Sequence, residues 1–424
     1  MILNGLVRCE VCKKVTQVKI EVSKCSVRYP VYVPCKNCNT LFYGEYIQDN
    51  EKVECGINFI NAQDVSGVPI LPDYQGIITG DFISDKIKDI TNPSHQITFP
   101  KWMAFKDRIG MKNYNDLFYN VNYLSNIKDQ GIFEWARVLN LWFNKNYVYL
   151  AEQLEYFLDA NKNNIPLNNE KQYLSALRRL TSKVTIGFFF NNEHERFFQQ
   201  TKKNLSCMYI KYPDKTKRFI KELGKEDLFI CLEKHIYERI KDFAAYIPDM
   251  IPIFSLLFLS EEERQLLLDT NSEYGTFTTS FERMKQLYID CFETAVKTLV
   301  IPIGLENILK RGDYNNFNDR KVNGLDKFLK LDKAFDKIQL LNNANCFAPR
   351  LKENLNNKLR NSIGHCDYSV DNFKQSICYD KGRKQMSLCN VTYLCYNIGL
   401  YLMEVFDVIT LLHEAYYEFH LFES

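Results

Sequence analysis

Hydrophobic and polar residues follow two different periods along this chain, and the period changes near residue 100. The run Val15–Val22 alternates apolar and polar side chains, which is typical of a β-strand, and Ser26–Val33 looks like the strand that pairs with it. Residues 51–100 keep a strand and turn character, with several glycines and isolated prolines. From Lys101 onwards long helical patterns take over, as in Phe133–Leu158, so the pattern predicts a β region followed by a helical body.

The helical body divides near residue 250, where Pro248 and Pro252 interrupt the periodic pattern. Residues 101–250 read as a helical middle region with polar connectors. Residues 251–424 read as a C-terminal bundle, with one capping box at Ser260 and Glu263.

The end of the chain predicts four helices in up-down order. The first begins at a capping box formed by Thr279 and Glu282 and ends at Ile301-Pro302. A short hairpin turning at Lys381-Gly382 precedes the last helix. The other three helices cover Asn323–Leu341, Pro349 to about Ile363, and about Ser387 to Phe419.

The last of these helices contains an apolar stretch, Val391–Leu412, that is long enough to span a bilayer. It also carries Glu404 and Asp407, and a carboxylate near the centre of a bilayer costs roughly 2.5–3.5 kcal/mol. We therefore expect a buried bundle helix and no membrane partner. His413, near the end of this helix, suits the negative end of the helix dipole.

Composition narrows the class of protein. Hydrophobic residues make up 46% of the 424 residues and charged residues 25%, which is ordinary for a globular protein with a real core. The formal net charge of +2 is lower than that of most nucleic-acid-binding proteins, so any RNA site would depend on a local basic patch. Fourteen scattered cysteines without an apolar leader at the start predict a reduced, cytoplasmic setting.

Four of the cysteines form two CxxC pairs, Cys9 with Cys12 and Cys35 with Cys38. Twenty-two strand-like residues separate the pairs, a spacing that lets four thiolates meet at one tetrahedral Zn²⁺. We therefore predict a structural zinc ribbon over residues 1–50. The alternatives are a redox pair or buried cysteines that act as small hydrophobic residues.

A ribbon of this size is not expected to bury a core of its own, so metal binding should be coupled to its folding. What the ribbon contacts stays open among nucleic acid, a partner protein and its own chain.

Candidate chemistry is concentrated in Leu359–Tyr368, which reads LRNSIGHCDY. Arg360 can hold a phosphate, and His365 can gain or lose a proton near neutral pH, which are the two tasks in cutting a phosphodiester. Asn361 lies four residues before His365 and would share a helix face with it. Gly364 can adopt a positive φ, end the helix and turn His365 towards Arg360.

Asp367 and Tyr368 follow this stretch and are candidates for holding the imidazole or the substrate.

The run of Arg360, Asn361 and His365 resembles the RNxxxH signature of HEPN-domain ribonucleases. The resemblance covers about residues 279–424 and includes the helix order and the long apolar closing helix. It implies a homodimer formed through the C-terminal bundle, with two such stretches in one composite site. It also implies metal-independent RNA cleavage by attack of the 2′-hydroxyl on the adjacent phosphate. His365 would move the proton, Arg360 would stabilise the phosphoryl oxygens and Asn361 would position groups around them.

The fold class predicted from these patterns is a mainly α multi-domain protein. It has a small β zinc ribbon, a β/turn-rich connecting segment, an α-helical middle region and a HEPN-like four-helix up-down bundle. Similar layouts are associated with bacterial toxins and phage-defence proteins, so a regulatory partner or a phage trigger is part of this expectation. Two alternatives stay open. Arg360 could cap a helix while His365 occupies a turn, or the protein could be a non-catalytic dimeric scaffold whose ribbon recognises nucleic acid or a protein.

Overall fold

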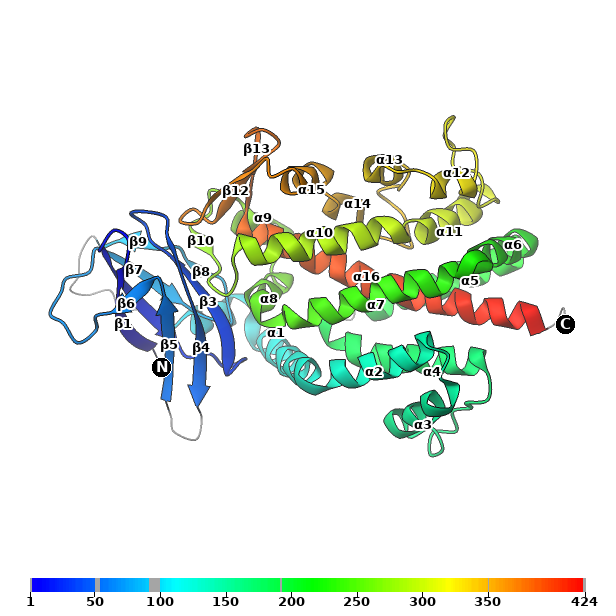
Figure 1. Cartoon of the computed structure of the whole chain (residues 1–424), viewed down its shortest axis with the longest axis horizontal. Coiled ribbons are helices and arrows are strands. Elements are labelled where there is room, and N and C mark those ends of the chain that lie inside the picture. The colour runs from blue at the N-terminus through cyan, green and yellow to red at the C-terminus, as the bar shows by residue number, and fades with distance from the viewer. Residues whose placement is uncertain (1, 50–53, 91–99, 191–192, 350, 422–424) are drawn as a thin grey trace. The chain divides into compact units, whose positions relative to one another are not determined.

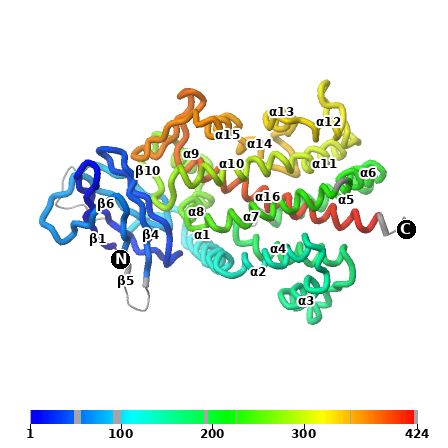
Figure 2. The backbone as a smooth tube through the Cα atoms, viewed as in Figure 1, coloured from blue at the N-terminus to red at the C-terminus, as the bar shows by residue number. Residues whose placement is uncertain are grey.

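The computed structural model describes residues 2–49, 54–90, 100–190, 193–349 and 351–421, and it is mainly α-helical (Figure 1). The chain forms two compact units, each built from three segments that can be followed by colour in Figure 2. Unit 1 contains Met1–Ser125, Ala245–Tyr288 and Lys358–Tyr396, and unit 2 contains Asn126–Ala244, Ile289–Asn357 and Asn397–Ser424. The mainly α, multi-domain class is confirmed.

The strands of unit 1 form two main sheets. One has the order β6-β1-β2-β7-β9 and the other the order β3-β4-β5. Their bounds are β1 Ile2–Cys9, β2 Val15–Glu21, β3 Arg28–Pro34, β4 Leu41–Asp49, β5 Glu54–Ile60, β6 Ala62–Asp64, β7 Tyr74–Ile78 and β9 Lys88–Asp89.

The pairing of these strands differs from the sequence-based expectation. Both predicted strands exist as β2 and β3, but they lie in different sheets. β2 pairs antiparallel with β1 and parallel with β7, whereas β3 pairs with β4. The pairing of β2 with β3 was therefore wrong, because β2 forms its hydrogen bonds with the preceding strand and with a strand about 60 residues later.

A hydrophobic core lies within this β structure. Its members are Val7, Cys9, Val18, Ile20, Tyr29, Val31, Val33, Cys35, Phe42, Tyr46, Ala62, Ile78, Ile87 and Phe277. Residues after position 53 supply part of this core and strands to both sheets, so the cysteine pairs belong to a larger β structure. Residues 1–50 therefore share their core with later parts of the chain, which agrees with the expectation that a ribbon of this size does not bury a core of its own.

Unit 1 also contains further strands and helices, among them α15, the helix that carries Arg360 and Asn361. They are α1 Lys101–Asn126, β8 Ser84–Asp85, α8 Ile247–Phe254, α9 Glu261–Leu268, β10 Tyr274–Gly275, α15 Asn357–Gly364, β11 Ser369–Asp371, β12 Ser376–Tyr379 and β13 Lys384–Ser387. The last residue of α1 and the first residue of α15 belong to unit 2. The predicted hairpin is confirmed as β12 and β13, with Lys381 and Gly382 both at positive φ in the turn. The capping box of Ser260 and Glu263 is also confirmed, at the start of α9.

The helices of unit 2 come from three parts of the chain. They are α2 Ile132–Phe143, α3 Tyr147–Leu158, α4 Glu170–Thr185, α5 Glu193–Lys211, α6 Pro213–Gly224, α7 Leu228–Ala245, α11 Val300–Arg311, α12 Leu325–Leu329, α13 Ala334–Gln339 and α14 Leu351–Asn354. The last residue of α7 belongs to unit 1. Two further helices, α10 Phe281–Thr298 and α16 Leu388–Leu421, begin in unit 1 and end in unit 2.

Several predicted helices of the C-terminal part are shorter in the structure than the pattern suggested. The first predicted helix was expected to end at Ile301-Pro302, but a new helix, α11, already begins at Val300. Proline is compatible with the first turn of a helix, so Pro302 does not interrupt it. The stretch 323–341 contains α12 and α13 with a break between them, and the stretch from Pro349 contains α14 and α15. Phe133–Leu158 is likewise divided into α2 and α3.

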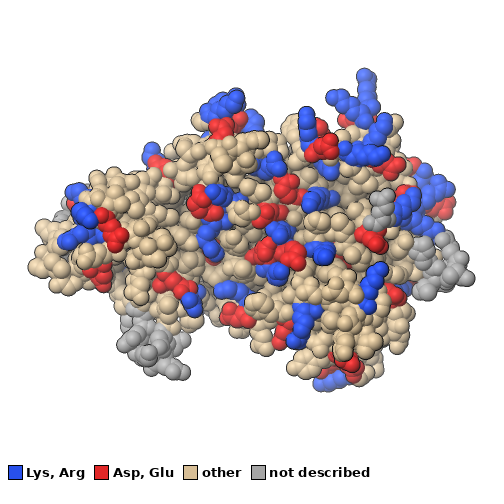
Figure 3. Space-filling model, in the orientation of Figure 1, with Lys and Arg blue, Asp and Glu red and all other residues tan. Residues whose placement is uncertain are grey.

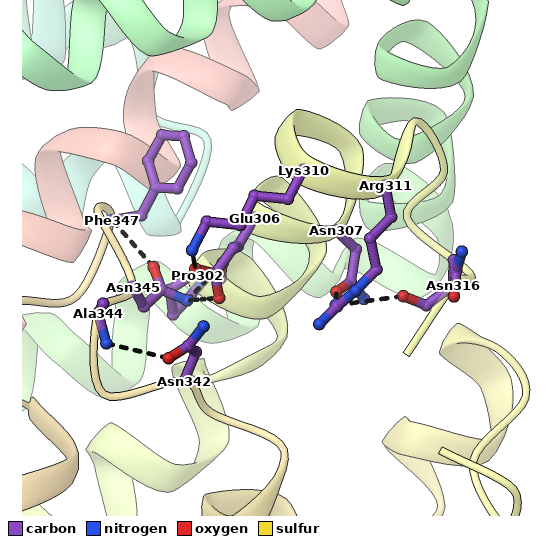
Figure 4. A network of polar contacts seen from close by, with 10 residues as sticks. All are labelled: Pro302, Glu306, Asn307, Lys310, Arg311, Asn316, Asn342, Ala344, Asn345 and Phe347. Carbon is purple, nitrogen blue, oxygen red and sulfur yellow. Dashed lines mark hydrogen bonds and ion pairs between the residues drawn. The ribbon is translucent and has the colours of Figure 1, made fainter. Parts of the chain in front are cut away.

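The break after α13 is fixed by a buried asparagine, Asn345, which is 1% exposed. Its Nδ2 donates to the Pro302 carbonyl and to Glu306 Oε2, each at 3.0 Å, while its Oδ1 accepts from the Phe347 N–H at 2.9 Å (Figure 4). Glu306 also pairs with Lys310 on the same helix. The amide therefore satisfies the buried backbone of the loop, which explains how an irregular segment can pack against α11.

The long final helix, α16, is confirmed. Leu388–Phe419 is long and apolar enough to cross a membrane, and it is the one such helix among the described residues. Of its most apolar window, 78% is buried inside the protein.

Candidate metal centre and nuclease motif

The four cysteines of the two CxxC pairs lie together. Cys9 Sγ is 3.6 Å from Cys38 Sγ, and Cys12 Sγ is 3.5 Å from Cys35 Sγ. All four sulfurs lie within 4.8 Å of one another. Four thiolates bound at about 2.3 Å in a tetrahedron would have sulfurs about 3.8 Å apart, so this cluster is positioned to bind one metal ion.

The two cysteine pairs are held by the same local backbone geometry. The Cys9 N–H donates to the Lys14 carbonyl at 2.9 Å, and the Cys35 N–H donates to the Thr40 carbonyl at 2.8 Å. The residue four positions after each first cysteine, Lys13 or Asn39, has a left-handed φ of 65° or 62°. Each pair therefore occupies a tight turn between two strands, and the two turns face one cluster.

The thiols of this cluster differ in their proton affinity. Burial raises the pKa of Cys9, and burial raises the pKa of Cys35 to about 12. Burial also acts on Cys38, but contacts with Thr40 and with the neighbouring thiols outweigh it and lower the pKa of Cys38 to about 6. Metal binding must therefore displace protons from the more buried sulfurs.

The candidate motif with Arg360, Asn361 and His365 lies at the C-terminal end of α15. The His365 N–H donates to the Asn361 carbonyl at 2.9 Å, the Cys366 N–H to the Ile363 carbonyl at 3.2 Å, and the Asp367 N–H to the Ser362 carbonyl at 2.8 Å. These bonds form a Schellman motif, in which the residue after the C-cap adopts a left-handed conformation. That residue is Cys366, with a φ of 55°.

The expected role of Gly364 was therefore wrong. Gly364 is the last helical residue of α15, and its φ is not positive. His365 is the C-cap, and the turn that ends the helix comes one residue after it. Gly364 was chosen because glycine is the residue most often found at positive φ after a helix, whereas the hydrogen bonds place the left-handed residue at Cys366.

The three motif residues are linked in the structure. Arg360 Nη1 donates to Asn361 Oδ1 at 3.1 Å. Asn361 and His365 are one helical turn apart, and a backbone hydrogen bond joins them. Arg360 and Asn361 are half-buried, while His365 is exposed and can be reached by a large substrate.

The two residues after the motif have different surroundings. Asp367 is exposed, and Tyr368 is half-buried. The Tyr368 hydroxyl accepts a hydrogen bond from Lys285 Nζ at 3.1 Å, and its ring packs edge-on against Phe281 with centroids 5.3 Å apart. The ion pair with Glu282 and the contact with Tyr368 raise the pKa of Lys285.

Further basic side chains lie on the motif helix and on the elements next to it. Asp380, in the hairpin turn, accepts from Lys358 at 2.8 Å and from Arg383 at 2.9 Å. The Asp380 N–H also donates to Ser362 Oγ at 2.9 Å, so the hairpin is fixed to the helix that carries Arg360. Lys285 was not found from the sequence, because it lies on α10, about 75 residues before the motif, and only the fold brings it near.

The second cysteine turn contacts the chain that follows the motif. Asn39 Oδ1 accepts from the Phe373 N–H at 2.8 Å, and the Asn39 carbonyl accepts from Asn372 Nδ2 at 3.1 Å. Phe373 packs against the β core, and its ring lies 5.5 Å from Lys36 Nζ. Part of what the cysteine turns contact is therefore their own chain, at the loop between β11 and β12.

Comparison of the chain with protein-family models, with curated proteins and with solved structures gives no match.

Proposed function

We propose that this protein is an endoribonuclease of the HEPN type that cuts RNA at Arg360, Asn361 and His365. The observation that carries the proposal is the linked arrangement of these residues. An exposed histidine lies one helical turn from an asparagine that is hydrogen-bonded to an arginine. This supplies, within one short stretch of the chain, a group that can move a proton and a group that can bind a phosphate, which cleavage by an internal 2′-hydroxyl requires.

Each residue has one role in this scheme. His365 takes the proton from the 2′-hydroxyl or gives one to the leaving 5′-oxygen. Arg360 donates to the phosphoryl oxygens as negative charge builds on them. Asn361 holds the Arg360 guanidinium through its side-chain oxygen. The attack forms a 2′,3′-cyclic phosphate and releases a 5′-hydroxyl. The nucleophile is the 2′-hydroxyl itself, so the proposed reaction needs neither a metal ion nor a water molecule.

Local charge supports an RNA substrate. On the face seen in Figure 3 basic and acidic residues are interspersed, which fits the net charge of +2. Near the motif, however, Lys285 contacts Tyr368, and Lys358 and Arg383 both contact Asp380, which balances part of their charge. Tyr368 and Asp367 are the proposed substrate contacts beside this basic group. Such a local cluster can hold successive phosphates of an RNA strand.

The proposal also includes the oligomeric state, the cellular role and the identity of the metal. One motif supplies one histidine, and a homodimer through the C-terminal bundle would place two motifs in one composite site. A cytoplasmic bacterial enzyme of this kind would act in phage defence or as a toxin, under the control of a partner or trigger. The metal of the cysteine cluster is proposed to be Zn²⁺ with a structural role, because four thiolates leave no open coordination position for water.

A comparison of two histidine variants tests the proposal. His365→Ala should abolish cleavage of total RNA and tRNA, with the protein still folded. The matched control is His235→Ala on α7, where the imidazole Nδ1 contacts the Cys231 carbonyl at 2.7 Å on its own helix. Cleavage by the control at the parent rate and none by His365→Ala would support the proposal. Equal cleavage by parent and His365→Ala would refute it and favour the scaffold.

A further inference from the structure

Unit 2 contains a pocket that the proposed cleavage site does not use. Its walls are mainly aromatic, and they come from the ends of α2, α3, α6, α7 and α16. The pocket has a volume of about 90 Å³, several times the roughly 10–15 Å³ that one water needs by the same measure. The aromatic and imidazole rings that line it are Trp142, Phe143, Tyr147, Phe229, His413 and Tyr416, together with Tyr417.

His413, which lines this pocket, is paired with a buried carboxylate behind the pocket wall, that of Glu233. Glu233 is 1% exposed and His413 is 3% exposed. His413 Nδ1 lies 2.8 Å from Glu233 Oε1, and Trp142 Nε1 donates to Glu233 Oε2 at 3.4 Å. Because Nδ1 is committed to the carboxylate, Nε2 is the ring nitrogen that His413 can offer to a ligand.

The geometry around His413 limits how a ligand can approach it. Its ring is stacked between Phe229, with centroids 4.8 Å apart and planes at 10°, and Tyr417, with centroids 5.1 Å apart and planes at 23°. Both faces of the imidazole are therefore covered. Only its edge is open, so it favours a ligand that forms a hydrogen bond in the plane of the ring.

The approach of Tyr416 to the pocket depends on a glycine. A Cβ placed on Gly224 would lie 2.1 Å from the Tyr416 ring. The ring thus lies directly against the backbone at the end of α6, and it shapes one side of the pocket. Aromatic walls of this kind bind flat rings by stacking.

The rim of the pocket carries a lysine in an unusual position. Lys145 is exposed, lines the pocket, and has a left-handed φ of 55°. It occupies the residue after the C-cap of α2, where the Asn146 N–H donates to the Leu141 carbonyl at 2.9 Å. Glycine is the least strained residue at such a position, so a lysine places a cation at the pocket entrance at a cost in stability.

We propose that this pocket binds a nucleotide, with the base among the aromatic rings, its hydrogen-bonding edge at His413 and its phosphate at Lys145. A nucleobase is flat and presents donors and acceptors in its plane, which matches the covered faces and open edge of His413. A phosphate group matches the cation at the rim. The same chemistry is carried by a free mononucleotide and by one nucleotide of an RNA strand.

Calorimetric titration of the parent with AMP, GMP, CMP and UMP, and with the four nucleosides, tests this proposal. At least one nucleotide should bind, should quench Trp142 fluorescence, and should bind about fivefold more tightly than its nucleoside, because the nucleoside lacks the phosphate. Binding by none of the eight at millimolar concentration would overturn the proposal. A short ribo-oligonucleotide distinguishes the two sources: tighter binding of the oligonucleotide indicates an RNA strand, and equal binding indicates a free nucleotide.

Three variants locate the binding. His413→Gln keeps a donor for Glu233 but removes the second ring nitrogen, and it should weaken binding of nucleotide and nucleoside alike about tenfold. Lys145→Gly should weaken nucleotide binding about fivefold, leave nucleoside binding unchanged and raise the melting temperature. The matched control is Lys381→Gly, which relaxes another lysine at positive φ, 58°, far along the chain from the pocket residues. Control and Lys145→Gly binding nucleotides equally well would overturn the assignment, even where His413→Gln fails to fold.

This inference does not depend on the proposed ribonuclease activity. All titrations can be made with the His365→Ala protein, which has an intact pocket. Loss of cleavage with unchanged nucleotide binding, or the reverse, would therefore separate the two claims.

Discussion

Replacing Gly364 by alanine tests where the motif helix ends, because two conformations of Gly364 predict effects of opposite sign. In the structure Gly364 is the last residue of α15, its φ is not positive, and no neighbouring atom lies within 4 Å of the position that an added methyl group would take. Alanine is preferred over glycine inside a helix by about 0.5–1 kcal/mol. Since Gly364 is at the helix end, we expect a gain of about 0.5 kcal/mol in the free energy of unfolding.

The opposite effect would follow from a left-handed Gly364. Alanine in that conformation costs roughly 1–2 kcal/mol, so the two cases differ by about 2 kcal/mol. The partner variant is Cys366→Gly, at the residue that does have a positive φ of 55°. It should raise the free energy of unfolding by about 1 kcal/mol, since glycine adopts this conformation at little steric cost.

Urea unfolding followed by far-UV circular dichroism measures both variants against the parent. Two small gains in stability are expected, with the slope of the transition unchanged. A loss of about 1 kcal/mol or more for Gly364→Ala, or any clear loss for Cys366→Gly, would refute the assignment of His365 as the helix C-cap.

Three further predictions concern the metal centre and the hairpin. Asn39→Ala should destabilise the protein by about 2 kcal/mol and Asn39→Gly by about 1 kcal/mol. Both variants lose the hydrogen bond to Phe373, and only alanine is strained at the left-handed φ of this position, so equal unfolding midpoints of the two variants would contradict this account. Elemental analysis should find about one zinc per chain, lost in Cys35→Ser with a lower melting temperature, and a metal-free parent would remove the zinc claim. The ion pair with Lys358 lowers the pKa of Asp380, so its contribution to stability is present above the unfolded pKa of about 4 and is lost as the pH falls through the folded pKa. The melting temperatures of parent and Asp380→Asn should therefore converge in acid, and a gap that widens there would contradict the pairing.

Local patterns predicted the parts of the structure that depend on neighbouring residues. The CxxC spacing indicated the cysteine cluster because each turn is closed by bonds within six residues, as between Cys9 and Lys14. The Ser260 capping box and the turn at Lys381 were found for the same reason.

Contacts between distant parts of the chain were not predictable in this way. The partner of β2 includes β7, and the alternating pattern of a strand does not identify which strand lies beside it. Lys285 reaches Tyr368 only through the fold, and Asn345 fixes the loop after α13 because it binds the Pro302 carbonyl of another helix. Glu233, a polar residue on an amphipathic helix, gave no sign of its burial against His413.

Cleavage of RNA in the presence of EDTA, with analysis of the product ends, is the most direct test of the proposed mechanism. The parent and an Arg360→Ala/His365→Ala variant would be incubated with total RNA and with tRNA, under conditions in which both keep any metal ion bound at the cysteine cluster. The account predicts cleavage by the parent alone, with 2′,3′-cyclic phosphate and 5′-hydroxyl ends. Equal cleavage by the double variant, or parent products ending in a 3′-hydroxyl and a 5′-phosphate, would contradict it.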